Sequence, residues 1–389
     1  MFVPISNTPR DYAWGSDGKI SALLGVTASG RPEAELWLGA HPAWPTRIDP
    51  VPGGDPSLDG HETLAAWIES APAALGSRAE LPFLLKVLAA AKPLSLQVHP
   101  TLETAARRFA EENAAGIPID APERNYRDPL HKPELILALE DGFVALCGVR
   151  PLEQRQAIVA ELGIADQLDP HDVAATLADL LTHRQSSRVH ELVERVAARA
   201  AALTGSEFAA HYRWIERLES LHPGDPGVVI ALLLNLVELR AGEALYLPAG
   251  NLHAYLSGIG IEVMAASDNV LRGGLTAKHI DVPELLAVAD THALPLPVVE
   301  PVTEGDALSY RGEAREFELT VVSGQADVVL HGPSIVLNLG GPAVLRGALG
   351  VHQLAHGEAV CVTPDEVRLE LTGDHVVLAG PQLGWAAEA

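Results

Sequence analysis

Short runs of apolar residues, broken by Gly, Pro and Asp, make up the first 150 residues. Residues 34–39 (Ala-Glu-Leu-Trp-Leu-Gly) and 81–88 (Leu-Pro-Phe-Leu-Leu-Lys-Val-Leu) are typical of this pattern. Runs of this length between turn-forming residues predict β-strands rather than helices. Two stretches, residues 62–70 and 102–113, have helical spacing instead, so we expect short helices there.

The pattern changes after Pro151. Residues 154–221 are rich in Ala, Leu, Glu and Arg, contain almost no Gly, and place apolar residues at helical spacing. This predicts three or four amphipathic helices that pack together. Their histidines are expected at the surface or at helix caps rather than as metal ligands; they are His171, His183, His190 and His211.

Strand patterns resume at about residue 235, and a linker rich in Pro and Val at residues 294–302 leads into further short strands. We therefore expect a mainly β protein with helices, divided into three domains. They are a catalytic domain of residues 1–150 and 224–293, an inserted helical domain of residues 151–223, and a C-terminal β-barrel or sandwich of residues 294–389 without catalytic residues.

Composition narrows the class of protein. The formal net charge of −24 argues against binding to nucleic acid or to anionic membrane surfaces. No run of about 18 apolar residues is present, and the first residues lack the pattern of a signal peptide, so we expect a cytoplasmic protein. Cys147 and Cys361 lie in separate apolar stretches, which favours buried free thiols over a disulfide or a metal pair.

Polar and apolar residues alternate in the segment Ser95-Leu96-Gln97-Val98-His99. On a strand, residues two apart point to the same face, so Ser95, Gln97 and His99 form one polar row. A buried polar row needs hydrogen-bond partners or a ligand. Metal ligation by Gln97 and His99 and ordinary hydrogen bonding in a core are equally compatible with this pattern.

Two further segments contain residues of metal-ligand type. Glu134 follows His131-Lys132-Pro133 and opens an apolar strand, where a ligand, a solvated rim residue and an ion-pair partner of Lys132 are all possible. Residues 242–253 (Gly-Glu-Ala-Leu-Tyr-Leu-Pro-Ala-Gly-Asn-Leu-His) resemble the second metal motif of the cupin barrels, in which the final His projects towards a metal. The match departs only at Ser257, where that motif usually has Asn.

Together, Gln97, His99, Glu134 and His253 supply two imidazoles, a carboxylate and an amide. Two His and one carboxylate suit a catalytic zinc ion with open positions for water or substrate. The same set also suits ferrous iron or manganese, because ligand type alone does not decide the metal.

Over nearly its whole length the chain resembles the type I mannose-6-phosphate isomerases (phosphomannose isomerases) of the cupin superfamily. The resemblance rests on separate blocks in the family's order, which are residues 12–16, 34–42, 82–86, 94–100, 131–134, 248–258 and 262–279. The last block reads Glu-Val-Met-Ala-Ala-Ser-Asp-Asn-Val-Leu-Arg-Gly-Gly-Leu-Thr-Ala-Lys-His. The resemblance implies a cupin-type (jelly-roll) barrel as the catalytic part.

The resemblance also implies one Zn²⁺ ion held by Gln97, His99, Glu134 and His253, and an active-site arginine at Arg272. The implied reaction interconverts mannose 6-phosphate and fructose 6-phosphate through a cis-enediol, so the partner is a small sugar phosphate. This reaction needs carbonyl polarisation, a base and stabilisation of the enediolate. A metal ion and a guanidinium suit the first and last of these needs. We expect a monomer.

Other roles are less sharply defined. Ser95, Lys86 and Lys278 are candidates for phosphate binding, and Tyr255 for contact with the sugar. The candidates for the base are Glu262, His131, Lys132 and a zinc-bound water. Without the resemblance, the sequence pattern favours a surface arginine beside a Gly-Gly turn for Arg272.

Two alternative functions fit parts of the pattern. Oxygen-activating cupins usually present three His and a Glu, so Gln97 weakens a metal-dependent oxygenase as an alternative. A non-catalytic sugar-phosphate-binding protein is the second alternative, against which Arg272 and the complete ligand set argue. Turnover of fructose 6-phosphate without oxygen uptake separates the isomerase from both.

Overall fold

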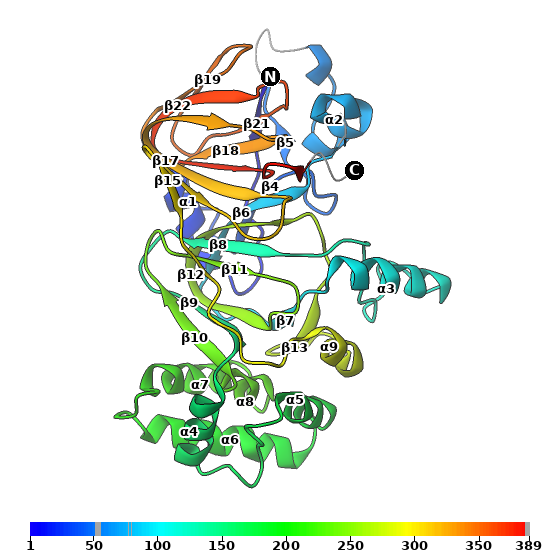
Figure 1. The fold of residues 1–389 in the computed structure, drawn as a ribbon, viewed down its shortest axis with the longest axis vertical. Helices are drawn as coiled ribbons and strands as arrows, with labels where there is room; N and C mark the ends of the chain where they lie inside the picture. Colours follow the sequence, from blue (N-terminus) through cyan, green and yellow to red (C-terminus); the bar gives the residue numbers. More distant parts are fainter. Residues whose placement is uncertain (51–55, 77, 79, 386–389) are drawn as a thin grey trace.

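Two large antiparallel sheets form most of the molecule, and a group of helices packs at one end (Figure 1). The computed structural model describes residues 1–50, 56–76, 78 and 80–385. The protein is mainly β with helices, as the sequence predicts. No helix in these described residues is long and apolar enough to cross a membrane.

The first sheet, which we call the site sheet, carries the segments singled out in the sequence. Its main path runs β10-β9-β12-β8-β11-β14, and four more strands pair beside it. The strands are β4 (Glu35–Leu38), β6 (Phe83–Ala90), β7 (Leu96–Val98), β8 (Glu134–Ala138), β9 (Phe143–Val149), β10 (Leu234–Leu239), β11 (Ala244–Leu247), β12 (His253–Ala265), β13 (Leu271–Gly274) and β14 (Val298–Val299).

Side chains on these strands alternate between two environments. In β8, Leu135 packs into a core shared with the second sheet, whereas Ile136 packs in a separate cluster on the opposite face. Glu134 therefore lies on the face of Ile136. By the same alternation, His253 of β12 lies on the face of Tyr255, which belongs to the same cluster as Ile136. The alternation gathers the polar side chains on the face turned away from the shared core.

The second sheet, the C-terminal sheet, is built mainly from residues beyond 300. Its strands are β15 (Val302–Glu304), β16 (Ala307–Tyr310), β17 (Glu318–Val329), β18 (Ser334–Asn338), β19 (Ala343–Arg346), β20 (Val351–Leu354), β21 (Ala359–Val362), β22 (Arg368–Gly380), β1 (Phe2–Ser6) and β5 (Arg47–Ile48). Val3 of β1 pairs with Cys361 of β21. A strand from the start of the chain thus belongs to this sheet, a pairing that local sequence patterns do not reveal.

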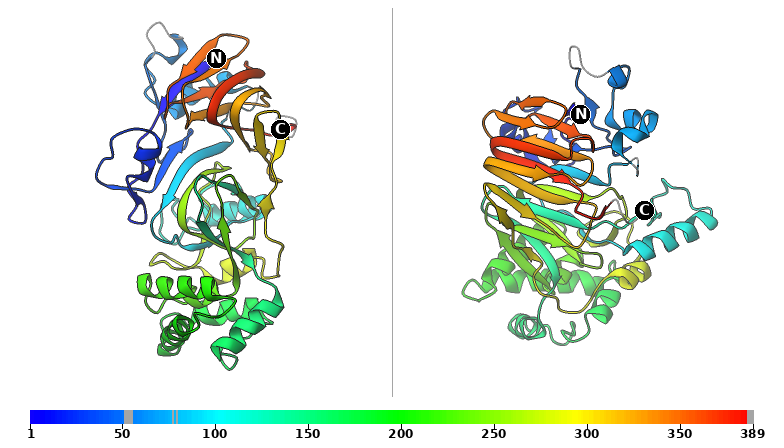
Figure 2. Two further views of the ribbon diagram at one scale, coloured as in Figure 1. Left: turned by 90° about the vertical axis from the view of Figure 1, so that its left-hand side faces the viewer. Right: turned by 45° about the horizontal axis from the view of Figure 1, so that its top comes forward.

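The two sheets share one hydrophobic core. Leu85 and Ile261 of the site sheet lie in the same buried cluster as Phe317, Leu337 and Val377 of the C-terminal part. Both views of Figure 2 show the orange and red strands of the C-terminal sheet next to the strands of the site sheet. The C-terminal strands therefore support the site sheet through side-chain packing.

Five helices lie between β9 and β10, where the sequence predicts a helical region. They are α4 (Leu152–Leu162), α5 (Val173–Thr182), α6 (Ser187–Ala202), α7 (Ala209–Leu221) and α8 (Gly227–Ala231). Asp172 and Ser186 begin α5 and α6 as N-caps, because each side chain accepts a backbone N–H three residues on. The apolar faces of the helices pack together and against residues of the site sheet such as Leu146.

One expectation for this region is wrong. His211 is buried rather than at the surface, because its helix packs against Arg150 and the ring lies beside that guanidinium. Elsewhere, the two short helices predicted from spacing are α2 (Leu64–Ser70) and α3 (Leu102–Ala114), and the chain also forms α1 (Lys19–Leu23) and α9 (Val282–Val288). Cys147 and Cys361 are buried free thiols, as predicted.

Because the two sheets share a core, a substitution within it should lower the free energy of unfolding, independently of any effect on catalysis. Ile261 is fully buried in β12, between β6 and β8. The Ile261→Ala substitution should destabilise the protein by about 2–5 kcal/mol, since it leaves a cavity in packed surroundings. The measurement is the midpoint of urea unfolding. Val367→Ala, at a position 61% exposed, is the control and should leave the midpoint nearly unchanged.

Candidate metal centre and cavity

Three side chains from separate segments converge in the interior of the site sheet. Ligand atoms of His99, Glu134 and His253 all lie within 4.8 Å of one another, and all three residues are buried. Glu134 Oε1 lies 3.2 Å from His99 Nε2, and Glu134 Oε2 lies 3.3 Å from His253 Nε2. The structure thus brings together three of the four residues predicted as ligands, and the fourth is close by.

Strand pairing explains this convergence. His253, the first residue of β12, pairs with Gln97 of β7, and His99 follows directly after β7. Glu134, the first residue of β8, pairs with Leu247 at the end of β11. Between β11 and β12 the chain turns at Gly250, whose φ of +83° favours glycine.

A backbone carbonyl orients each imidazole. His99 Nδ1 lies 2.7 Å from the carbonyl oxygen of Asn269, and His253 Nδ1 lies 2.9 Å from that of Asn251. Because a carbonyl only accepts hydrogen bonds, each Nδ1 carries the proton and each Nε2 presents a lone pair to the centre. Burial, together with Lys132, lowers the pKa of His99 to about 4, which keeps this imidazole neutral as ligation requires.

The centre also contains buried atoms that lack partners. His99 Nε2 and Glu134 Oε2 have no hydrogen-bond partner among the described residues. Leaving buried polar atoms unsatisfied is costly. A divalent cation between them would satisfy both, and Gln97 Nε2, 3.3 Å from His253 Nε2, brings an amide group to the same space. The donor set therefore fits a zinc ion.

Lys132 balances the charge of Glu134. Its Nζ lies 2.5 Å from Glu134 Oε1, and both side chains are buried. Burial acts to raise the pKa of Glu134, but the adjacent Lys132 ammonium outweighs it and holds that pKa well below its usual range. The carboxylate is thus anionic, and the contact is a buried ion pair rather than a surface one.

A cavity of about 1150 Å³ opens next to this centre. Gln97 and Lys132, which contact His253 and Glu134, line it, so the metal centre adjoins the cavity at these two residues. Ser95, Arg272 and Lys278 line the same cavity, as do the aromatic residues Tyr12, Trp14 and Trp37. The volume is sufficient for a small organic ligand.

One part of the cavity wall carries unneutralised positive charge. Arg272 is half-buried and lies opposite Gln97 in the pairing of β13 with β7, while Arg127 and Lys278 are exposed. Within the described part of the chain, none of these three cations forms an ion pair with a carboxylate. Burial and the neighbouring cations lower the pKa of Lys278 and of Arg272. In a protein of net charge −24, such a cluster indicates an anionic ligand.

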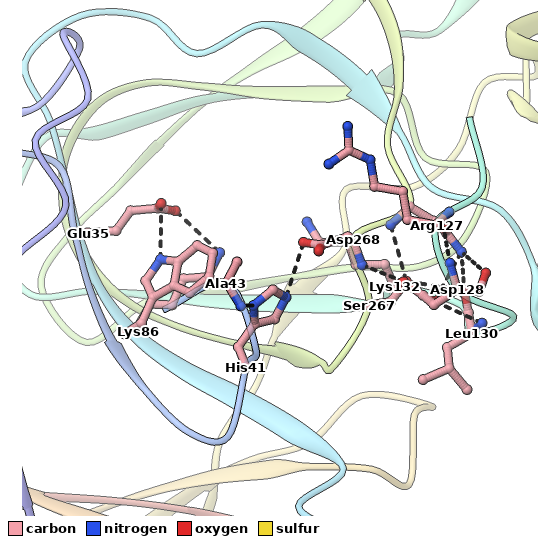
Figure 3. Close-up of polar contacts among 12 residues, drawn as sticks. Glu35, His41, Ala43, Lys86, Arg127, Asp128, Leu130, Lys132, Ser267 and Asp268 are labelled. Carbon is pink, nitrogen blue, oxygen red and sulfur yellow. Dashed lines mark hydrogen bonds and ion pairs between the residues drawn. The ribbon is translucent and has the colours of Figure 1, made fainter. Parts of the chain in front are cut away.

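Lys86 occupies a different environment from the other predicted phosphate ligands. It is buried, with Nζ 3.2 Å from Glu35 Oε1 and 2.9 Å from Glu262 Oε2. Figure 3 shows Lys86 beside Glu35, whose other oxygen accepts the indole N–H of Trp37 at 3.1 Å. Burial acts to lower the pKa of Lys86, but the two carboxylates raise it, so its positive charge is already paired.

Three other predicted residues lie outside the cavity lining. Tyr255 is 1% exposed and packs its ring against Phe143, with the centroids 5.4 Å apart. His131 is not part of the cavity lining, and its Nε2 lies 2.6 Å from an oxygen of Glu316. Glu262 is buried beside Lys86, and burial raises its pKa.

Arg127 and Asn269 belong to the site, although no sequence pattern predicts a role for them. Asn269 Oδ1 accepts the backbone N–H of Arg127 at 2.7 Å, while the carbonyl oxygen of Asn269 holds His99. In Figure 3 the guanidinium of Arg127 points away from the hydrogen-bonded part of its loop. Residues 124–130 have neither strand nor helix spacing, so their only signal was their position just before the predicted ligand Glu134.

Comparisons with known proteins agree with this geometry. A family model of the phosphomannose isomerase type I catalytic domain matches residues 2–152. The mannose-6-phosphate isomerase of Salmonella typhimurium is 37% identical over 378 residues, which covers 94% of this chain and 96% of that protein. The human mannose-6-phosphate isomerase is 34% identical over 322 residues, covering 72% of this chain and 71% of that protein.

Solved structures give the same result. A crystal structure of the Salmonella typhimurium mannose 6-phosphate isomerase, bound to its substrate fructose 6-phosphate and to zinc, is similar with a TM-score of 0.86 at 35% identity. The similarity covers 98% of this chain and 100% of that one. With near-complete coverage in both sequence and structure, the chain belongs to the type I mannose-6-phosphate isomerase (phosphomannose isomerase) family.

Proposed function

We propose that this protein interconverts mannose 6-phosphate and fructose 6-phosphate through a cis-enediol, at one zinc ion per chain. The observation that carries the proposal is the buried His99–Glu134–His253 group next to a cavity with a cationic wall. The relatives support it, because they are named mannose-6-phosphate isomerases and one of them binds fructose 6-phosphate and zinc. Neither the oxygenase nor the binding-protein alternative gains support from them.

In this proposal His99, Glu134 and His253 hold the metal ion, and Gln97 supplies a fourth ligand. When bound, zinc polarises the sugar oxygens at C1 and C2 and makes the adjacent proton easier to remove. The Nδ1–H groups of His99 and His253 donate to the carbonyls of Asn269 and Asn251, which fixes both rings before the metal binds.

We assign the proton transfer between C1 and C2 to Lys132, which would act as the neutral amine once zinc compensates the charge of Glu134: it would accept the proton from one carbon and return the same proton to the other. Of the candidate side chains from the sequence, Lys132 lines the cavity, whereas Glu262 and His131 do not. Glu262 binds Lys86, so its role in this proposal is to balance charge beneath the reacting atoms. Arg272 stabilises the enediolate oxygen, because a guanidinium stays protonated and presents a planar pair of donors.

The phosphate group is assigned to Lys278 and Arg127, with Ser95 as a hydrogen-bond donor. All three line the cavity, and the two cations lack carboxylate partners within the described residues. Lys86 is less suitable because Glu35 and Glu262 already pair its charge. Aromatic side chains of the cavity wall, rather than the buried Tyr255, are available to the sugar.

We also propose the predicted domain layout, with a cupin-type barrel formed by the site sheet. The motif at residues 242–253 supports the barrel, since it forms the whole of β11, a turn and the first residue of β12. Helices α4 to α7 lie within the proposed inserted domain of residues 151–223. In this layout β1 and β5 belong to the catalytic domain by sequence but pair with strands of the C-terminal sheet. We propose a cytoplasmic monomer.

The metal ligands give a first test. His253→Ala should lose both zinc and isomerase activity, because it removes a neutral imidazole ligand. Zinc content and turnover of fructose 6-phosphate are measured on the same preparation. His356→Ala, an exposed residue of the C-terminal part, is the control and should retain both. Full zinc content and full rate in His253→Ala would show that the site is misassigned.

Arg272→Lys should keep the fold and the zinc but lower kcat by roughly 10²-fold, because one lost oxyanion donor costs about that much. The measurement is steady-state kinetics with fructose 6-phosphate. Arg213→Lys, at an exposed position on α7, is the matched control. A normal kcat with a raised KM would move Arg272 from catalysis to binding.

Lys278→Met and Arg127→Met should each raise KM for fructose 6-phosphate by about 10- to 100-fold, since hydrogen bonds to charged groups contribute about 1.5–3 kcal/mol. Zinc content should not change in either variant. The titrations are done at low ionic strength, where screening is weakest. Arg107→Met on α3, outside the cavity lining, is the control. A variant with unchanged KM would exclude that residue from the phosphate site.

A further inference from the structure

Residues 311–317, between β16 and β17 of the C-terminal sheet, form a loop that reaches the segment preceding Glu134. We call it the docking loop. Its Glu316 accepts a hydrogen bond from His131, with Oε1 and Nε2 2.6 Å apart. Both side chains are mostly buried, at 24% and 21% exposed, so solvent screens this contact only partly. His131 directly precedes Lys132, to which we assign proton transfer.

The docking loop is held from within by one side chain. Gln382 Nε2 lies 3.0, 2.8 and 3.1 Å from the carbonyl oxygens of Gly312, Ala314 and Phe317, respectively. The backbone N–H of Gln382 also donates to the carbonyl of Arg315 at 3.0 Å. A single residue thus joins carbonyls along most of the loop, which limits its conformational freedom.

The loop is also fixed to the site sheet. The hydroxyl of Tyr246 on β11 accepts the N–H of Ala314 at 3.1 Å, and Tyr246 pairs with Leu135 next to Glu134. At Gly312 a Cβ atom would lie 2.2 Å from the Tyr246 ring, so only glycine permits this approach. These contacts place Glu316 at a fixed position relative to the start of β8.

The segment that carries His131 and Lys132 is anchored on its other side too. The carbonyl of Leu130 accepts from Ser267 Oγ at 3.2 Å and from Asn269 Nδ2 at 2.8 Å (Figure 3). On the C-terminal side of the segment, the carbonyl of Pro133 accepts the N–H of Ala265. The backbone of this segment is thus held at Leu130 and Pro133. The contact with Glu316 instead holds a side chain, that of His131, which directly precedes Lys132.

We propose that Glu316 is a positioning residue of the active site, which holds His131 and thereby fixes the Leu130–Pro133 backbone that directs Lys132 towards Glu134 and the cavity. This assigns the C-terminal part a role in catalysis, contrary to the expectation from sequence that it has none. The inference rests on the proposed function, since it uses Lys132 as the residue that moves the proton. The hydrogen bond forms with either a neutral or a protonated imidazole, provided that Nε2 carries hydrogen.

The test compares Glu316→Ala, Glu316→Gln and the control Glu313→Gln, which alters an exposed carboxylate of the same loop. Glu316→Ala should lower kcat about tenfold, with KM and zinc content unchanged and the unfolding midpoint lowered by no more than one lost hydrogen bond explains. Glu316→Gln keeps an acceptor oxygen and should retain most of the wild-type kcat. Glu313→Gln should match the wild type.

A double-mutant cycle with His131→Ala separates positioning from other roles. If Glu316 acts only through His131, the double variant should be no slower than the slower single variant. An unchanged kcat in Glu316→Ala, fully additive losses, or a loss confined to stability and zinc content would each overturn the inference. A wild-type protein without isomerase activity would instead overturn the proposed function itself, so the two failures are distinguishable.

Discussion

The carboxylate of Glu134, buried between two imidazoles and an ammonium, is the constraint on which the rest of the site depends. Removing such a charge from water costs several kcal/mol unless partners surround it. Here the partners come from different segments, so β8, β12 and the end of β7 must be in register at once. A slip of one residue in β8 would turn Glu134 into the core between the sheets. The buried charge of Glu134 therefore meets its partners only when the strands of the sheet are in the correct register.

Much of the metal centre could be predicted because its residues follow local rules. Glu134 and His253 begin strands beside turn residues, and a two-residue alternation decides which face each one occupies. The same holds for the caps of α5 and α6, where Asp172 and Ser186 lie directly before helical spacing starts. Such signals are contained within a few residues of the sequence.

The remaining features depend on contacts that no local pattern encodes. Lys86, a phosphate candidate from the sequence, lines the cavity, but its ion pairs with Glu35 and Glu262 depend on two neighbouring strands that no local pattern reveals. Helical spacing does not tell which neighbour covers a half-polar face of a helix. The buried position of His211 therefore cannot be predicted from it. Arg127 lies in an irregular segment whose shape is fixed by the buried side chain of Asn269.

The cations of the site fall into two groups that reconcile an acidic protein with an anionic ligand. Lys86 and Lys132 are buried and paired, so they add little net charge to the cavity. Arg127 and Lys278 are exposed and unpaired within the described residues, so their field extends into the cavity. The long-range repulsion from a net charge of −24 is thereby opposed only where the ligand is expected to bind.

The pairing of β1 with β21 has a consequence for how the chain acquires its structure during synthesis. Phe2 pairs with Val362, so β21, the partner on one edge of β1, leaves the ribosome hundreds of residues after it, whereas β5 on the other edge follows early. At about 5–20 residues per second, β1 waits for tens of seconds with an unpaired edge. Contacts of such long sequence separation also slow folding, because a large loop must close before they form. A nascent chain of this protein therefore exposes this edge of β1 to chaperones, or to other nascent chains, until β21 has been synthesised.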